Sequence, residues 1–206
     1  MAESLKLRTL ARCQLLIGRY PAFRYDARGG GGPGHSSTNA DGRSSLQFPA
    51  DQLSIPPLDW RSTRFLGVPL PPGLQIAIVP EQLEGHWDPA SGSIALDFRA
   101  RFRFSISIGI GIGIGKDTAA QHHRIYAAPD LAIHCCLSSG QVAGVRHRGC
   151  GRPLNAAGEA LLVGVARVAP SGDAWLDRFL GLPDDALAVL QCQLERAAPA
   201  DCITTP

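Results

Sequence analysis

The sequence predicts a mainly β protein: an antiparallel β-sandwich or partly open barrel of six or seven strands, with one short C-terminal helix. Three observations support this fold class. Glycine (23 residues) and proline (16 residues) are frequent in the chain of 206 residues, which favours short elements separated by turns. The longest periodic segment alternates with a period of two, as a strand does. Predicted strands do not alternate with helices, which argues against a parallel doubly wound sheet.

Residues 1–45 differ in composition from the rest of the chain. Arginines are interspersed with leucines in "LKLRTLARCQLLIGR", and a glycine run and a Ser/Thr/Asn stretch follow. This basic, acid-poor composition is typical of an organelle transit peptide, and a disordered tail is the alternative. In both cases we expect residues 1–45 to lie outside the fold. A β domain is then expected over residues 46–196, and a disordered tail over residues 197–206.

The first two strands are expected at residues 74–79 and 83–88, after a proline-punctuated stretch in which each proline disfavours helix. In the second strand, Trp87 lies on the apolar face, and Glu84 and His86 lie on the opposite face because side chains alternate.

The third strand carries the strongest periodic signal. Every even position from Ile94 to Ile114 is apolar, and the odd positions change from polar residues to glycines. At about 3.3 Å per residue the whole pattern would span roughly 70 Å, which is too long for one strand of a small domain. We therefore expect a strand over residues 94–107 and a low-complexity Ile–Gly insertion at about 107–123, with a loop or flexible ribbon over about 109–125.

The remaining elements follow from local signals. Strands are expected at residues 131–137 and 160–168, with a weaker one at 141–149. One short helix is expected after Asp173, a potential N-cap, and before Gly181, where a helix can end. Residues 184–195 have helical propensity at first and alternation later, which favours a turn of helix followed by a strand.

Several segments carry a family resemblance: "PLPPGLQIAIVPEQLEGHWDPASGSIALDFRARFRFSI", "YAAPDL", "LLVGVARV" and "FLGLPDDALAVLQC". Over roughly residues 66–195 the chain resembles an uncharacterised family found in cyanobacteria and in plant or algal plastids. The resemblance implies a plastid location in a eukaryote, or a cytoplasmic one otherwise, and it implies that the Ile–Gly run is an insertion. No chemistry is attached to that family, so it supplies no site residues.

Motifs for common chemistry are incomplete. A phosphate-binding loop would use Gly115 and Lys116, but Ile110 and Asp117 occupy positions that require glycine and a hydroxyl residue. Residues 47–206 have no basic excess, so nucleic acid is not an expected partner.

Four residues are of types that bind zinc, but their spacing matches no compact zinc site: Cys135, Cys136, His147 and Cys150. Ordinary thiols and surface histidines are the favoured interpretation. No metal and no cofactor are predicted.

A row of charged residues supplies the site candidates: Arg99, Arg101, Arg103, Glu84 and His86. A hairpin register that pairs Glu84 with Arg99 and His86 with Asp97 would bring opposite charges together across two strands. The result would be a polar or anion-binding site, or simply a salt-bridged solvent face. A slipped register, with Glu84 opposite Asp97, would weaken both interpretations.

The sequence thus favours a non-enzymatic β domain that binds a lipid, a pigment or an anionic membrane surface. A scaffold or assembly factor that docks another protein is the alternative. An enzyme that uses Glu84 and His86 is a third hypothesis, and it requires a concave pocket at those two residues.

Overall fold

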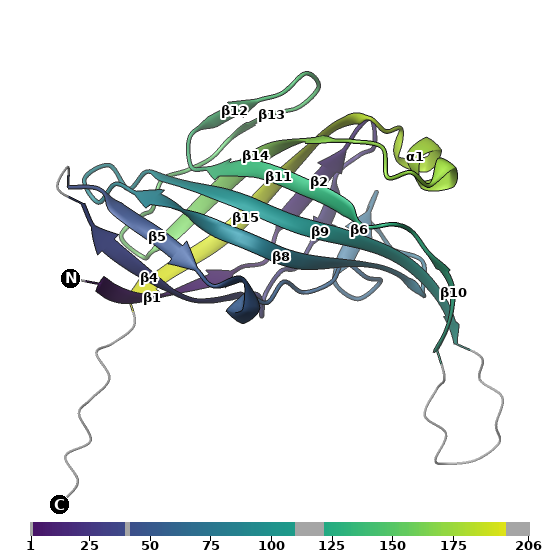
Figure 1. Ribbon diagram of the computed structural model, residues 1–206, viewed down its shortest axis with the longest axis horizontal. Coiled ribbons are helices and arrows are strands. Elements are labelled where there is room, and N and C mark those ends of the chain that lie inside the picture. The colour runs from purple at the N-terminus through teal and green to yellow at the C-terminus, as the bar shows by residue number, and fades with distance from the viewer. Residues whose placement is uncertain (1, 40–41, 110–121, 197–206) are drawn as a thin grey trace, which may run out of the picture.

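The chain is mainly β, as the sequence predicts. The computed structural model describes residues 2–39, 42–109 and 122–196. Within them lie one antiparallel sheet of thirteen strands, a two-stranded sheet, a 3₁₀ turn (η1, Ala50–Gln52) and the helix α1 (Ala174–Leu180) (Figure 1). The predicted number of strands, six or seven, is too small.

The strands in chain order are β1 (Ala2–Thr9), β2 (Cys13–Ile17), β3 (Phe23–Tyr25), β4 (Gly31–Thr38), β5 (Ser44–Phe48), β6 (Thr63–Phe65), β7 (Val68–Pro69), β8 (Leu74–Trp87), β9 (Ile94–Gly109), β10 (His122–Ala127), β11 (Leu131–Ser138), β12 (Gln141–Ala143), β13 (Arg148–Cys150), β14 (Glu159–Val168) and β15 (Asp184–Arg196).

Strand β1 closes the large sheet into a barrel. The strands run in the order β1-β4-β5-β8-β9-β11-β14-β15, and β1 pairs with β4 on one side and with β15 on the other. Each of these pairings is antiparallel. Closure leaves no free edge in this ring of strands, and it encloses an interior lined by the inward-facing residues of every strand.

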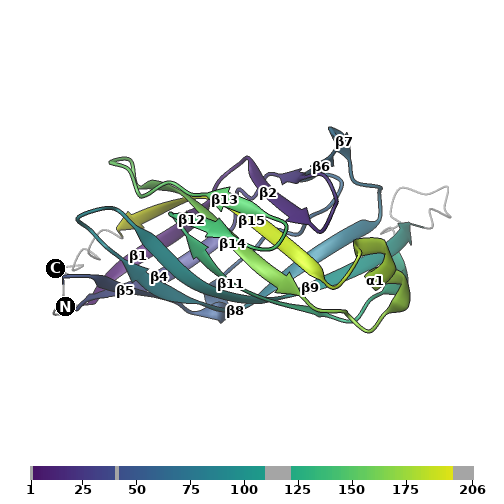
Figure 2. The ribbon, with the colours of Figure 1, turned by 90° about the horizontal axis from the view of Figure 1, so that it is seen from above.

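The two ends of this barrel differ. At the end nearer the N-terminus, which we call the packed end, Leu5, Leu46, Leu96 and Leu162 belong to one buried apolar cluster. At the other end β15 pairs with β2, and β3, β6 and β7 extend the sheet from there. Helix α1 and β10 lie at this same end (Figures 1 and 2). We call it the mouth end.

The expectation that residues 1–45 lie outside the fold is wrong for the residues that the structure describes. They form β1 to β4 and the start of β5, and Leu5 is only 1% exposed. The glycine run is part of the packing: a Cβ added at Gly34 would lie 2.3 Å from Phe48 Cδ1, and one at Gly31, whose φ is 108°, would lie 2.0 Å from Leu7 O. Glycine is needed where two strands and a ring come this close. The transit-peptide interpretation stays a prediction.

The predicted strands at 74–79 and 83–88 are one strand, β8. A register shift between Pro80 and Gln82 accommodates the proline without ending the strand, as a β-bulge does. The extra residue also changes the parity of the inward face, from Ile76 before the bulge to Leu83 after it, and both are buried.

Strand β9 confirms the predicted strand at 94–107, and its even positions from Ile94 to Phe104 face the interior. Beyond it, β10 pairs with the end of β9, so the loop predicted to extend to residue 125 is wrong over residues 122–125. Residues 110–121, which contain most of the Ile–Gly run, lie outside the described residues.

The C-terminal elements follow the predicted signals in part. Asp173 caps α1 by accepting a hydrogen bond from the Leu176 backbone N–H at 2.8 Å, and Gly181 ends the helix at φ 71°. The turn of helix expected at the start of residues 184–195 is wrong, because this segment pairs with β14 from Asp184 onward. The weak strand expected at 141–149 is the hairpin of β12 and β13. Among the described residues, no helix has the length and apolar character needed to span a membrane.

Candidate functional site

The predicted arginine row lies on the outer wall of the barrel and is matched by acids. Arg99 Nε lies 3.5 Å from Asp97 Oδ1, Arg103 Nε lies 3.1 Å from Asp130 Oδ2, and Arg101 pairs with Glu81. All three arginine side chains are about half exposed. Because each charge has a nearby partner in solvent, the row resembles a salt-bridged surface more than an anion site.

The hairpin has the slipped register at Glu84 and His86, which weakens both interpretations of the charged face. Glu84 lies opposite Asp97 and His86 opposite Ala95, because the β8–β9 turn pairs Trp87 with Ile94. Glu84 accepts a hydrogen bond from Gln82 Nε2 at 2.6 Å, and both Glu84 and His86 are exposed. Neither residue lines the two interior spaces described below.

The cysteines and histidines do not converge. Cys135 faces the interior, and burial raises the pKa of its thiol to about 12. Cys136 faces outward beside His134, whose Nε2 lies 2.8 Å from Asp97 Oδ2. His147 and Cys150 lie at the β12–β13 hairpin. Within the described residues, no group of three or more His, Cys, Asp or Glu side chains could hold a metal ion.

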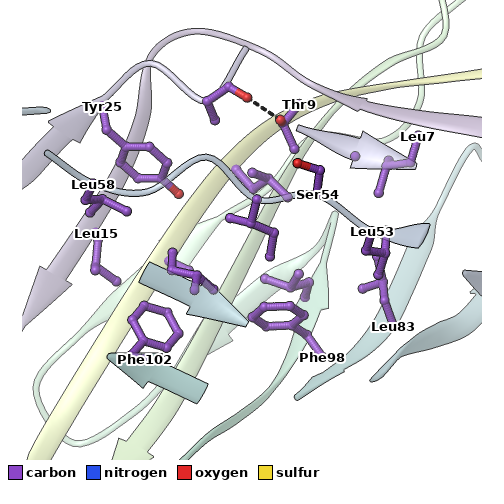
Figure 3. A pocket seen from close by; sticks show the side chains of 17 residues that line it. Leu7, Thr9, Leu15, Tyr25, Leu53, Ser54, Leu58, Leu83, Phe98 and Phe102 are labelled. Atoms are coloured by element: carbon purple, nitrogen blue, oxygen red, sulfur yellow. Dashed lines mark hydrogen bonds between the residues drawn. The ribbon is translucent and has the colours of Figure 1, made fainter. Parts of the chain in front are cut away.

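The interior instead contains two apolar spaces. The first, the inner cavity, has a volume of about 90 Å³ and is lined by residues of β1, β2, β3, β8, β9, β11 and β15, among other segments; its lining side chains are drawn in Figure 3. Its wall is aliphatic and aromatic, with Leu83, Phe98 and Phe102 from β8 and β9 on one side and Tyr25 and Leu58 on another. The segment between η1 and β6 crosses it, held by the backbone pairing of Leu58 with Ile76.

Three hydroxyl groups border the inner cavity. Thr9 Oγ1 donates a hydrogen bond to the Ala27 carbonyl, and Ser54 is exposed at the margin of the cavity. The Tyr25 hydroxyl points into the space (Figure 3) and has no hydrogen-bond partner among the described residues. Burial raises the pKa of Tyr25 well above its usual range, and the nearby Cys13 adds a smaller effect in the same direction. Its phenol is therefore a neutral donor.

The second space, the mouth pocket, has a volume of about 330 Å³ and lies at the mouth end beneath α1. Its aromatic lining residues are Tyr20, Phe23, Phe65, Phe104, Tyr126, Trp175 and Phe179. The Trp175 and Phe179 rings stack with centroids 5.2 Å apart, and the Tyr126 and Trp175 rings form a T-shaped contact with centroids 5.1 Å apart. The Tyr20 hydroxyl donates to the Phe179 carbonyl, which ties α1 to the chain after β2.

The two spaces are successive layers of one interior. Four strands contribute a residue to the inner cavity and the residue two positions away to the mouth pocket: Leu15 and Ile17 of β2, Tyr25 and Phe23 of β3, Ile78 and Ile76 of β8, and Phe102 and Phe104 of β9. Residues two apart on a strand share a face and are separated by about 7 Å. No charged side chain lines either space.

The lining residues from the N-terminal segment were missed because that segment was expected to be disordered. The signal was present in "RYPAFRY", residues 19–25, where Phe23 and Tyr25 flank Arg24 with strand alternation. Trp175 and Phe179 lie on the predicted helix, but no local pattern indicates that their rings line a pocket.

No protein-family model, curated protein or solved structure matches this chain. The resemblance to a cyanobacterial and plastid family therefore stays a prediction, and so does a plastid location. The proposed function therefore rests on the geometry of the two interior spaces.

Proposed function

We propose that the protein binds an apolar small molecule, a lipid or a pigment, in the mouth pocket. The observation that carries this proposal is a space of about 330 Å³ with an aromatic, uncharged lining at the end of a closed sheet. Small-molecule sites are usually concave, mostly apolar and largely preformed, with volumes of about 300–1,000 Å³. The mouths of β-barrels are one of the places where they occur.

The lining residues also favour a particular kind of ligand. Aromatic side chains offer large flat faces, and they stack in offset or edge-to-face arrangements with other π-systems. Each Å² of apolar ligand surface removed from water contributes about 25 cal/mol. The strands hold the walls, and the capped helix α1 holds Leu176 and Phe179 over the pocket, so little ordering is required on binding.

A filling substitution tests this proposal. Ile106 lines the pocket at partial exposure, so Ile106→Trp should occupy the space that a ligand needs. We expect the wild-type protein to take up the uncharged dye Nile red saturably, and Ile106→Trp to bind it at least about tenfold more weakly. Dye fluorescence measures the binding.

The matched control is Val79→Trp, which makes a comparable change on the outer wall of β8, where Val79 is 36% exposed. It should bind the dye as the wild type does. Thermal unfolding shows whether both variants are folded. Failure of the wild type to take up the dye or any member of a lipid and pigment extract contradicts the proposal, as does undiminished binding by folded Ile106→Trp.

A second candidate function is docking of the mouth end on an anionic lipid surface. The observation that favours it is the sequence and backbone conformation of the turn between β6 and β7. Leu66 and Gly67 connect β6 to β7, with φ 52° and φ 84°. Two-residue hairpin turns with both φ values positive favour Asn-Gly or Asp-Gly. Here the first position is a leucine that is 71% exposed. A strained apolar residue held in solvent indicates a contact made outside the chain.

The surroundings of Leu66 fit a membrane surface. Val68, Ile125, Trp175 and Phe179 are also exposed, on elements that lie at the same end of the barrel (Figure 2). Arginines of these elements lack the acidic partners of the β9 row: within the described residues, Arg64, Arg124 and Arg178 have no carboxylate within 4.0 Å. Exposed apolar side chains on the same elements as arginines without carboxylate partners suit a bilayer with anionic headgroups.

Vesicle co-sedimentation tests the second function. We expect wild-type protein to sediment with anionic vesicles in low salt and much less with neutral ones. Leu66→Asp should reduce binding severalfold without unfolding the chain, because aspartate tolerates positive φ better than leucine does. Val79→Asp on the outer wall is the matched control and should bind normally. A wild-type protein that stays in solution with anionic vesicles contradicts this function and leaves a protein partner as the explanation for the exposed leucine.

A further inference from the structure

The inner cavity contains one polar group that the fold leaves unused. Thr9 satisfies its hydroxyl with the Ala27 carbonyl, and Ser54 reaches solvent. Tyr25 keeps some accessible surface because it lines the cavity, yet its hydroxyl meets no acceptor among the described residues (Figure 3). Its oxygen is not among the fully buried polar atoms that lack a partner, so it is accessible from the cavity. A donor in such a position usually has a partner, which can be ordered water or a ligand.

The surroundings of this hydroxyl restrict its partner. Its neighbours are apolar, for example Leu15, Leu58 and Phe102, so the partner must bring its own acceptor oxygen. A charged acceptor is disfavoured because no charged side chain lines either space, and burying an unpaired charge costs far more than burying a neutral dipole. A space of about 90 Å³ admits a group of a few heavy atoms.

The inner cavity also adjoins the mouth pocket. Tyr25 lines the first space, and Phe23, two residues away on the same face of β3, lines the second. A molecule that enters through the mouth pocket would reach the Tyr25 hydroxyl about one layer, or roughly 7 Å, further along the barrel. The two spaces together suit an elongated ligand with an apolar body and one small polar end.

We propose that the ligand is an uncharged, elongated apolar molecule with a carbonyl oxygen at its leading end, and that this oxygen accepts a hydrogen bond from the Tyr25 hydroxyl in the inner cavity. The rest of the molecule lies in the mouth pocket. This inference rests on the proposed function and adds the chemical class of the ligand: a ketone, aldehyde or ester rather than a hydrocarbon or a carboxylate.

Ligand pairs test the assignment. A long-chain methyl ketone, the alkane of the same chain length and the corresponding carboxylate compete with Nile red for the wild-type protein. We expect the ketone to bind most tightly and the carboxylate most weakly. Tyr25→Phe should weaken ketone binding about threefold to tenfold, the effect of one neutral hydrogen bond, and should leave alkane binding unchanged.

Tyr20→Phe is the matched control. It removes the same hydroxyl group from a tyrosine that lines only the mouth pocket and donates to the Phe179 carbonyl. Its ketone-to-alkane ratio should equal that of the wild type. Equal losses for ketone and alkane in Tyr25→Phe would overturn the inference while leaving apolar binding intact, since the hydroxyl would then only support the cavity or hold a water. Absence of any binding by the wild type would instead count against the proposed function.

A measurement on the wild type alone keeps the inference testable if Tyr25→Phe does not fold. The carbonyl stretching frequency of the bound, isotopically labelled ketone should be lower than that of the same ketone in an alkane solvent, because hydrogen bonding weakens the C=O bond. A bound ketone with the frequency seen in alkane has no donor at its oxygen, and that result would overturn the assignment to Tyr25.

Discussion

The packed end and the mouth end of the barrel are built from the same strands but use their inward positions differently. At the packed end, Leu5, Leu46, Leu96 and Leu162 are each at most 2% exposed and fill the interior. At the mouth end, rings such as Phe104 stand around a space of about 330 Å³. Leucines interdigitate without voids, whereas flat rings at the margin of a barrel leave gaps. Both ends have a buried apolar cluster, which at the mouth end includes Leu176 and Leu180. The mouth end differs because a ring-lined space lies beside its cluster, so the capacity to bind resides there.

Polar contacts also distinguish the mouth end. Asp185, at the start of β15, is only 3% exposed and accepts hydrogen bonds from the backbone N–H groups of Val145 and Arg146. Arg146 Nε lies 3.0 Å from Asp184 Oδ2. These contacts attach the β12–β13 hairpin to the start of β15, next to Gly18, whose N–H donates to the Asp185 carbonyl. The mouth end thus contains a buried carboxylate, whereas the ion pairs of β1 at the packed end, Arg8–Glu195 and Arg196–Glu3, are largely exposed.

The largest effect is expected from the packed end. Leu5→Ala removes a side chain that is 1% exposed from the strand that closes the barrel, and it should lower the free energy of unfolding by about 2–5 kcal/mol. Urea denaturation measures the change. Ser4→Ala, at the exposed neighbouring position of β1, should change stability by less than about 0.5 kcal/mol. Equal, small effects would show that β1 does not close the sheet.

Much of the β9 half of the fold could be predicted because its alternation is local. The strand at 94–107, the helix capped by Asp173 and the strand at 160–168 all follow from neighbouring residues. Closure could not be predicted in this way. Leu5 lies opposite Arg196, at the other end of the chain, and no local pattern reveals such a pairing. The glycines of β4 suggest disorder until the ring of Phe48 is placed against Gly34.

The candidate site was missed for the same reason. The charged residues that the sequence indicates as site candidates, such as Arg101 and Glu84, lie on the outer wall. The residues around the two interior spaces are ordinary apolar residues. Their importance lies in the unfilled space that they enclose, which a sequence pattern does not reveal. The register of Glu84 on β9 depends on the β8–β9 turn, where Trp87 pairs with Ile94, and alternation alone does not determine the length of that turn.

An intermediate effect is expected from acid. The pKa of Asp185 is held below its ordinary value of 3.8, chiefly by the backbone N–H of Arg146, and the pKa of Asp184 is lowered chiefly by the Arg146 side chain. A lowered carboxyl pKa contributes stability that is present above the ordinary value and is lost as the pH falls through the folded-state value. Below about pH 4 the mouth end should therefore loosen before the packed end.

Amide hydrogen exchange at pH 6 and pH 3 measures this difference. Protection factors at Val145 and Arg146 should fall at pH 3, and those at Leu96 and Leu162 should change less. Asp185→Asn should reproduce the loss at pH 6, with a decrease in stability of about 1–3 kcal/mol. A uniform loss of protection across both ends in acid would mean that the barrel opens as one unit and that the difference between its ends is not energetic.

The smallest effect on stability is expected from a substitution on the outer wall. Its effect on vesicle binding can be compared with that of a similar substitution at the mouth end. Arg101→Ala removes one partner of an ion pair whose side chains are 53% and 39% exposed, so stability should change by about 1 kcal/mol or less. Binding to anionic vesicles should not change, because Glu81 already offsets this charge. Arg64→Ala, at the mouth end, should leave stability similarly unaffected but weaken vesicle binding, since no carboxylate within the described residues competes with a lipid headgroup for Arg64. If the two variants lose vesicle binding equally, the surface that binds vesicles is not confined to the mouth end, and the proposed docking of that end on a membrane is contradicted.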